Sequence, residues 1–241
     1  MIEAVWLALT QVIPEQVSAI WGRWCAPASM GMNPGNNRFF ADIHFMSKGG
    51  GGAVYGYDGW DHVGTPVTLG GLRAPDPELH ELVTPYKLLQ YEIEPDSAGA
   101  GQWRGGFGVR YAFEVDADNI ACANFGSGAR DFTAPIGIEG GLGCVPHQMN
   151  LSHADGSDDE MDGNRMYTFN TGDKITIVSS GGGGYGDPLQ REAGSVLRDV
   201  RNGLVSIELA RDLYGVAITN DGTPLGYTID EAATKQQRSN K

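Results

Sequence analysis

The stretch that most constrains the fold of this 241-residue chain reads Gly181-Gly182-Gly183-Gly184-Tyr185-Gly186-Asp187-Pro188. Its glycines formally satisfy the G-x-G-x-x-G pattern of dinucleotide loops. Such a loop opens directly into a helix and is followed by another strand, whereas Asp187-Pro188 intervenes here and two helical segments follow. No Lys-Ser or Lys-Thr follows the glycines, as a phosphate loop of the Walker type requires. We therefore interpret the stretch as a structural turn and not as a cofactor site.

Glycine is abundant throughout the chain, at 36 of 241 residues. This is about twice the usual ~7% share, and the glycines cluster without the period of collagen or the uniformity of a flexible linker. They are expected to serve turns and close approaches between backbones.

Short strand-like segments precede the glycines, from Trp21 to about Ser180. They alternate apolar and polar residues between clusters of Gly, Pro, Asn and Asp, a pattern that predicts β-strands bounded by turns. The segments are 38–45, 88–93, 109–115 and 174–178.

Helical spacing appears at both ends of the chain. Apolar residues recur at helical intervals from Ala4 to Ile13, and Pro14 ends the pattern. The helix starts without a capping residue, which suggests that an N-terminal partner segment is missing.

Two further helices are predicted after Pro188. Ser195 and Ser206 precede their apolar stripes as possible N-terminal caps, and Gly203 and Gly215 stand where C-terminal caps belong.

Together these patterns predict an α+β fold with a β-rich, glycine-rich core, an N-terminal helix and a C-terminal pair of short helices. Residues 1–190 form the β-rich region, and 191–216 are a helical segment of the same domain. Residues 217–241 are a polar tail, expected to be frayed or to be ordered by a partner.

The composition excludes several classes of partner. With 17 Lys and Arg against 30 Asp and Glu, the formal charge is −13, which repels nucleic acid and anionic membrane surfaces. No segment approaches the ~20 apolar residues of a membrane span, and the first apolar run carries Glu3, unlike a signal peptide. Cys25, Cys122 and Cys144 are odd in number and far apart, which favours reduced thiols. We expect a cytoplasmic protein.

The candidate chemistry lies after a second glycine run, at 48–53. Asp58, Asp61 and His62 fall within five positions among bulky aromatics, and carboxylates beside an imidazole suit acid-base or metal chemistry. The same residues also fit a turn at Asp58-Gly59 with packed aromatic rings and a locally bonded His62. We retain Asp58, Asp61 and His62 as candidate catalytic residues beside this structural alternative.

The remaining histidines give no metal-binding signature, because no HxxxH or HExxH spacing is present among His44, His80, His147 and His153. The acidic stretch 155–162 lacks the ligand spacing of an EF-hand and is interpreted as a solvated loop. We assign no metal ligand and no bound cofactor to this chain. Asp42 and His44, on one strand face, are the only other pair to test, with a structural role favoured.

Three segments, 91–108, 181–188 and 199–216, share an order and spacing with a known family. The first contains Gly101-Gln102-Trp103-Arg104-Gly105-Gly106-Phe107-Gly108. Together they resemble the C-terminal region of the hydantoinase B/oxoprolinase family, which includes ATP-dependent 5-oxoprolinases, N-methylhydantoinases and ketone carboxylases. Weaker similarity extends through 49–62. Arg104 matches a family motif, and we expect it to pair with an acid.

The resemblance implies a multisubunit enzyme that acts on a small molecule. A hydantoinase A-type subunit would supply the ATP site, and a B-type chain would supply part of the substrate and metal region. The family's metal ligands, a His and Asp pair with a further His, lie in an N-terminal half that this sequence does not contain, so none is carried over. ATP and a divalent metal are expected only in the complete complex.

The leading functional expectation is therefore a component, either a C-terminal part or a split subunit, of an ATP-dependent hydantoinase or 5-oxoprolinase-type cyclic-amide hydrolase, inactive alone. Its partners would be the A-type subunit and the missing N-terminal half of the B-type subunit. A subunit of a ketone carboxylase is an alternative, because the Asp58-Gly59-x-Asp61 pattern resembles that branch. A noncatalytic scaffold or truncated relic is a third.

Overall fold

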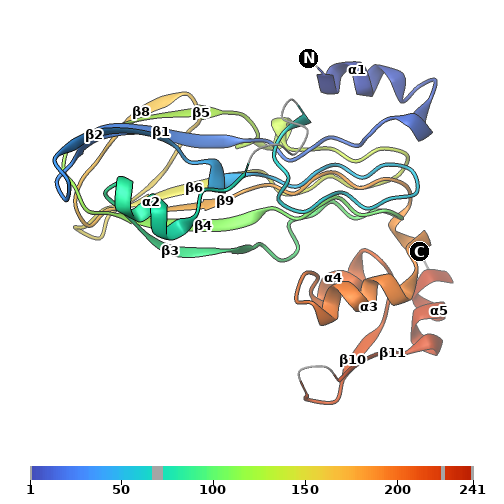
Figure 1. Cartoon of the computed structure of the whole chain (residues 1–241). Helices are drawn as coiled ribbons and strands as arrows, with labels where there is room; N and C mark the ends of the chain where they lie inside the picture. The colour runs from blue at the N-terminus through green and yellow to red at the C-terminus, as the bar shows by residue number, and fades with distance from the viewer. Residues whose placement is uncertain (1, 67–72, 224–225, 240–241) are drawn as a thin grey trace.

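The computed structural model describes residues 2–66, 73–223 and 226–239. It has an elongated shape, with a β-sandwich at one end, a bundle of extended segments beside it, and helices at the far end (Figure 1). This arrangement confirms the α+β fold, the β-rich core and the helices at both ends of the chain. The main elements are α1 (Ile2–Leu9), β1 (Cys25–Asn33), β2 (Arg38–Ile43), α2 (Pro77–Val83), β3 (Tyr86–Ile93), β4 (Val109–Val115), β5 (Ile120–Gly126), β6 (Gln148–Ser152), β7 (Asp158–Glu160), β8 (Arg165–Phe169), β9 (Lys174–Val178), α3 (Ala193–Arg201), α4 (Ile207–Asp212), β10 (Ile218–Asn220), β11 (Tyr227–Ile229) and α5 (Glu231–Ser239).

Two antiparallel sheets form the sandwich, with strand orders β2-β1-β5-β8 and β3-β4-β9-β6-β7. Alternation places every second side chain between them, so the strands predicted from period-two patterns are confirmed at β2, β3, β4 and β9. The acidic stretch contributes the short strand β7, whose side chains are all exposed. The large, fully buried side chains of the sandwich core include Tyr111, Phe113, Ile120, Leu151, Phe169, Ile175 and Ile177.

The glycine-rich segments form a bundle next to the sandwich, in which extended chains run side by side (Figure 1). Consecutive residues of the 181–186 segment turn their peptide groups toward different neighbours. This is the behaviour of a polyproline II helix, which has three residues per turn and no internal hydrogen bonds. The bonds pair Gly182 with Gly99 and Gly106, Gly183 with Ile20 and Ala53, and Gly184 with Ile138 and Leu142.

This geometry corrects the interpretation of 181–188 as a turn. The glycines run straight through the bundle, and the first positive φ, 73°, occurs only at Gly186. Glycine is required because the chains are so close. A Cβ at Gly105 or Gly182 would lie far inside 3.0 Å of a neighbouring carbonyl. The backbone N–H groups of Gly182, Gly183 and Gly184 all donate to protein carbonyls, so they do not form a phosphate cradle.

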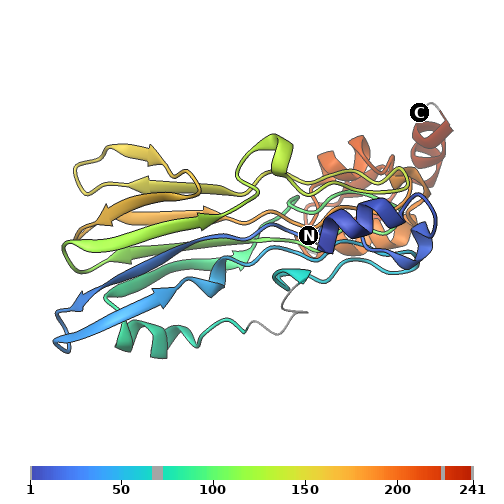
Figure 2. The same ribbon diagram turned by 90° about the horizontal axis from the view of Figure 1, so that it is seen from above.

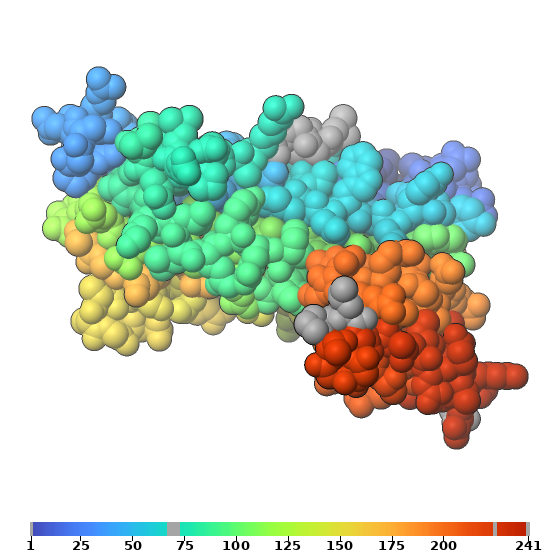
Figure 3. All heavy atoms as spheres, turned by 60° about the horizontal axis from the view of Figure 1, so that its bottom comes forward, coloured from blue at the N-terminus to red at the C-terminus, as the bar shows by residue number. Residues whose placement is uncertain are grey.

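Helices α3 and α4 pack with the hairpin β10–β11 on a second apolar cluster. The C-terminal residues, coloured orange to red, gather at one end of the molecule (Figure 3). Ser206 caps α4 by accepting from the Leu209 N–H, and Gly203 and Gly215 adopt positive φ, as predicted. The cap expected at Ser195 is wrong, because α3 begins at Ala193. None of the helices in the described ranges is long and apolar enough to cross a membrane.

The expectation of a frayed tail is also wrong, because β11 and α5 are ordered by contacts with their own chain. The Arg238 guanidinium donates to the carbonyls of Tyr214 and Arg191, and the Thr234 hydroxyl accepts from the Ala217 N–H. Hydrogen bonds to backbone groups can therefore order a polar segment. The composition of the segment does not predict these bonds.

Helix α1 lies over the bundle at the opposite side from the C-terminal helices (Figures 1 and 2). Trp6 and Leu7 pack against a small cluster that includes Ala19, Ala53 and Tyr185. The helix thereby forms one wall of a cavity above the bundle, described below.

Candidate functional site

The three predicted site residues lie on one extended segment that crosses the bundle. Backbone bonds fix it against the 104–107 segment, from Gly59 N to Arg104 O at 2.7 Å and from His62 N to Phe107 O at 2.8 Å. The structure places Asp58 and Asp61 in a shared network with two arginines, and it places His62 in a separate hydrogen-bonded pair.

Asp58 is bound by a bidentate ion pair. Arg191 Nη1 lies 2.6 Å from Asp58 Oδ1 and Arg191 Nη2 lies 2.8 Å from Oδ2, while the Arg104 backbone N–H donates to Oδ1 at 2.9 Å. Burial acts to raise the pKa of Asp58, but the bonds and charges of the two arginines outweigh burial and hold that pKa below its usual value. Asp58 is therefore a charged carboxylate whose acceptor sites are occupied.

Asp61 is the more available carboxylate. Its Oδ1 accepts from Arg104 Nη1 at 3.1 Å and from the Phe107 N–H at 2.9 Å, and 37% of the side chain is exposed. Asp199 of helix α3 completes the network, with its Oδ2 2.9 Å from Arg191 Nη2 and 3.3 Å from Arg104 Nε. The expectation that Arg104 pairs with acids is confirmed.

His62 has a left-handed backbone, with φ of 48°, which is uncommon outside glycine and often marks functional positions. Its Nδ1 lies 3.2 Å from the Lys48 carbonyl and its Nε2 lies 2.5 Å from the Tyr91 hydroxyl. A carbonyl only accepts, so Nδ1 carries the proton and Nε2 accepts from Tyr91. Burial and the Lys48 charge lower the pKa of His62 to about 4, and burial raises the pKa of Tyr91 to about 12. Both groups are neutral near pH 7.

An aromatic cavity of about 460 Å³ opens between α1 and the segment that carries Asp58. Its walls are mainly apolar, and its most exposed rings are Tyr57 and Trp60, at 75% and 70% exposure. Trp21 Nε1 donates to Ser18 Oγ at 2.9 Å on its inner side. The lining residues are Trp6, Ser18, Trp21, Gly51, Gly52, Val54, Tyr57, Asp58, Gly59 and Trp60.

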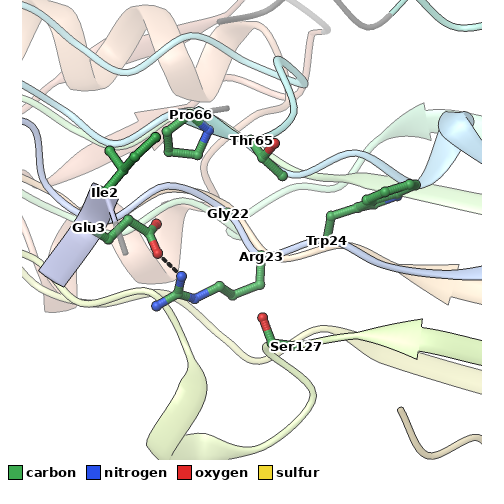
Figure 4. Close-up of a pocket in the computed structure, with 8 residues that line it drawn as sticks. All are labelled: Ile2, Glu3, Gly22, Arg23, Trp24, Thr65, Pro66 and Ser127. Atoms are coloured by element: carbon green, nitrogen blue, oxygen red, sulfur yellow. Dashed lines mark ion pairs between the residues drawn. The ribbon is translucent and has the colours of Figure 1, made fainter. Parts of the chain in front are cut away.

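Asp58 also borders a second, more polar cavity of about 320 Å³, which includes Gln102, Arg191 and Glu192. A third cavity, of about 300 Å³, lies near the N-terminal helix (Figure 4). There Glu3 points toward Arg23 and forms an ion pair with it, and Thr65 and Ser127 lie nearby. None of the predicted site residues lines this third cavity.

The comparisons identify the family. The model for hydantoinase B/oxoprolinase matches residues 1–188. The chain belongs to the hydantoinase B/oxoprolinase family.

Among its relatives is the caprolactamase subunit beta of Pseudomonas jessenii, which is 38% identical over 98% of this chain. The match spans only 41% of that subunit, so the chain covers less than half of the relative's length. The crystal structure of the ATP-dependent caprolactamase from the same organism has a TM-score of 0.79 at 36% identity, over 97% of this chain and 40% of that one. Nucleotide-free acetone carboxylase shares the fold, with a TM-score of 0.80 at 23% identity, over 98% of this chain and 36% of that one.

In this family member, sequence reasoning missed Arg191, Asp199 and Tyr91 as neighbours of the site. Asp58 and Arg191 are 133 positions apart, and no local pattern links them. Asp199 gave a usable signal, because it lies between Val196 and Val200 on the buried side of α3. An acid on an apolar helix face needs a partner, and here the partners are the two arginines.

The pair Asp42 and His44 does not form an open site. His44 is fully buried, with Nε2 3.1 Å from Ser29 Oγ and Nδ1 3.1 Å from the Tyr111 hydroxyl, while Asp42 bonds mainly to His80 at 2.9 Å. Burial lowers the pKa of His44 to about 4. Among the described residues, no three His, Cys, Asp or Glu side chains gather where they could bind a metal ion.

Proposed function

We propose that this chain is a component of an ATP-dependent enzyme that opens cyclic amides. Family membership and 38% identity to a caprolactamase subunit support this proposal, and the related solved enzyme is described as ATP-dependent. The chain would act with a hydantoinase A-type subunit and with the polypeptide that corresponds to the unmatched part of the B-type subunit. ATP and a divalent metal would bind elsewhere in that complex, which we place in the cytoplasm.

The observation that carries the proposal at the level of the site is the aromatic cavity beside Asp58. A cyclic amide has an apolar hydrocarbon part and one polar amide, and an aromatic-lined cavity of this size suits the hydrocarbon part. Trp60 and Tyr57 would cover it. The Ser18 hydroxyl at the wall is already bonded to Trp21 and to backbone carbonyls, so it holds the wall in place.

The three candidate residues would contribute differently. Asp58 has its acceptor sites occupied by arginine, so we assign it a positioning role that holds Gly59 and Trp60 at the cavity. Both hydrogen bonds of Asp61 use Oδ1, which leaves Oδ2 to interact with substrate or a partner. His62 and Tyr91 are both neutral near pH 7, and their pKa values of about 4 and about 12 lie too far apart for ready proton transfer. We therefore assign the pair a positioning role, in which the hydrogen bond between them fixes the segment that carries Asp61.

The test is turnover of the reconstituted complex with substituted chains. Asp61→Asn and His62→Ala are expected to lower lactam-dependent ATP turnover at least tenfold while the complex still assembles. Asp159→Asn and His153→Ala, at an acid-histidine pair beside β7 of the five-stranded sheet, are the matched controls and should change neither turnover nor assembly. Unchanged turnover in both site variants would leave a noncatalytic scaffold as the better account.

A carboxylase subunit is the second candidate, supported by the Asp58-Gly59-x-Asp61 pattern. The two reactions differ in one requirement, because carboxylation consumes bicarbonate. ATP turnover that a lactam stimulates without bicarbonate supports the hydrolase. A strict requirement for bicarbonate together with a ketone would replace it with the carboxylase.

A further inference from the structure

The two sheets of the sandwich have very different outer faces. On the five-stranded sheet, the outward rows read Lys87, Glu114, Lys174, Ser152 and Asp158; Gln90, Ala112, Thr176, Asn150 and Glu160; and Glu92, Arg110, Val178 and Gln148. These rows are mostly polar or charged, with oppositely charged neighbours such as Lys174 and Glu114. This is the ordinary pattern of a sheet with one face in water.

On the four-stranded sheet the outward rows contain no charge. They read Ile43, Ala28, Ala123 and Met166; Ala41, Met30, Ala121 and Thr168; and Phe39 and Met32. Alternation should have placed polar residues here, because the opposite face of the same strands already packs on the sandwich core. We call these ten residues the apolar outer face.

The apolar outer face is open to solvent in the described chain. Phe39 and Met166 are each 66% exposed and Met32 is 51% exposed. None of the described helices lies across the sheet when it is viewed from above (Figure 2). Its five large side chains expose roughly 600 Å², at the upper end of the ~300–600 Å² that the largest patch of a typical monomer presents. Patches at the upper end of this range often have a functional role.

Helix α1 adds a second apolar surface on the same side of the molecule (Figure 2). Trp6 and Leu7 face the bundle, while Val5 and Leu9 are exposed. Ile2 is also partly exposed and lines the cavity beside Arg23. A single partner lying along this side would cover both surfaces. Together they approach the ~800 Å² per partner of a standard interface.

We propose that the apolar outer face binds the part of the B-type subunit that this chain lacks, an inference that rests on the proposed function. The occupant is inferred from chain length. The same fold accounts for 40% of the related caprolactamase chain, and 41% of the subunit beta sequence matches. More than half of that subunit is therefore further polypeptide, which is large enough to cover an apolar face that this chain leaves open. The partner surface would be uncharged and aliphatic or aromatic, matching a face without ionic groups.

The experiment uses the unmatched part of the caprolactamase subunit beta as the probe, coexpressed with this chain and purified by a tag on the probe. The probe is first shown to capture the matched part of its own subunit. The test variant is Met30→Glu with Met166→Glu, which places two charges in the apolar outer face. The control variant is Gln90→Glu with Gln148→Glu, which adds the same charge to the polar face of the other sheet.

We expect the wild-type chain and the control to copurify with the probe and the test variant to be captured at least tenfold less, because a buried unpaired carboxylate is strongly unfavourable. Circular dichroism and the unfolding midpoint of each free variant show that folding is retained. Equal capture of all three chains would overturn the surface assignment. If the competent probe does not capture the wild-type chain, the missing part of the B-type subunit is not the partner of the apolar outer face. The same conclusion would follow if the chain alone formed a dimer that the test variant converts to a monomer.

This outcome is separable from the proposed function. Capture that depends on the apolar outer face, in a complex without lactam-dependent ATP turnover, would retain the docking surface and remove the hydrolase. Lactam-dependent turnover, together with capture that the Met30 and Met166 substitutions do not change, would retain the hydrolase and remove the docking surface.

Discussion

The sandwich and the glycine bundle are stabilised in different ways, although they belong to one continuous chain. In the sandwich, large side chains such as Tyr111, Phe113 and Ile175 fill the space between two sheets, and the stability comes from apolar area removed from water. In the bundle, backbone packs directly on backbone, and each extended segment is hydrogen-bonded to several other segments of the same chain. The difference teaches that the bundle depends on the absence of side chains, whereas the sandwich depends on their presence.

The largest expected effect is therefore the addition of one methyl group to the bundle. Gly105→Ala or Gly182→Ala would bring the new Cβ against a backbone carbonyl of a neighbouring segment. The packed segments of the bundle would therefore have to move apart. We expect a loss of about 4 kcal/mol or more in the free energy of unfolding, measured by urea denaturation or as loss of folded product. Gly156→Ala, in a surface turn with nothing near its Cβ position, should cost only about 1 kcal/mol. Equal effects at the two sites would refute direct backbone packing.

The removal of side-chain volume from the sandwich should come next. Ile175→Ala or Leu151→Ala would leave a cavity among fully buried neighbours, and we expect a loss of about 3 kcal/mol. Met166→Ala, on an exposed position of the same sandwich, serves as the control and should change the unfolding midpoint little in the isolated chain.

The ionic network that joins the bundle to helix α3 should have an intermediate effect. Asp199→Asn removes the buried carboxylate shared by Arg104 and Arg191, and we expect a loss of about 2 kcal/mol because two guanidinium groups are left undercompensated. Asp212→Asn, in an exposed pair with Arg211, should cost no more than about 0.5 kcal/mol. Similar small losses in both variants would show that the network does not hold the two regions together.

The smallest effect is the pH dependence from His62 in the bundle. Its pKa is about 4 in the folded chain and near ~6.5 when unfolded. The unfolded chain therefore binds more protons between these values, so stability falls as the pH drops from about 6.5 to about 4. We expect His62→Gln to reduce the loss in the free energy of unfolding between pH 6 and pH 5 by about 1 kcal/mol. Urea denaturation midpoints measured across this pH range check the prediction. An unchanged slope would mean that His62 is not held neutral by burial.

The sequence predicted the sandwich better than the bundle for a physical reason. Period-two alternation marks which side chains face a core, and it located β2, β4 and β9 correctly. Glycine carries no side chain and so gives no direction, and the 181–188 segment was interpreted as a turn although it is extended. The ordered helix α5 was missed because its contacts are bonds from polar side chains to distant carbonyls.

The candidate site was predictable only as a local cluster. The spacing of Asp58, Asp61 and His62 singled out a segment that the structure places beside an aromatic cavity. It did not show that Arg191 binds Asp58 or that Tyr91 bonds to His62, because these partners are 133 and 29 positions away. Whether the three residues contribute to turnover stays a prediction.

The central claim is tested most directly by ATP turnover in the complex, assayed with a lactam and without bicarbonate, with this chain present or omitted. The account predicts that the A-type subunit and the remaining B-type polypeptide turn over ATP in response to the lactam only when the chain is added. Full lactam-dependent turnover in its absence, or none in its presence although the complex has formed, would contradict a role as a component of a cyclic-amide hydrolase.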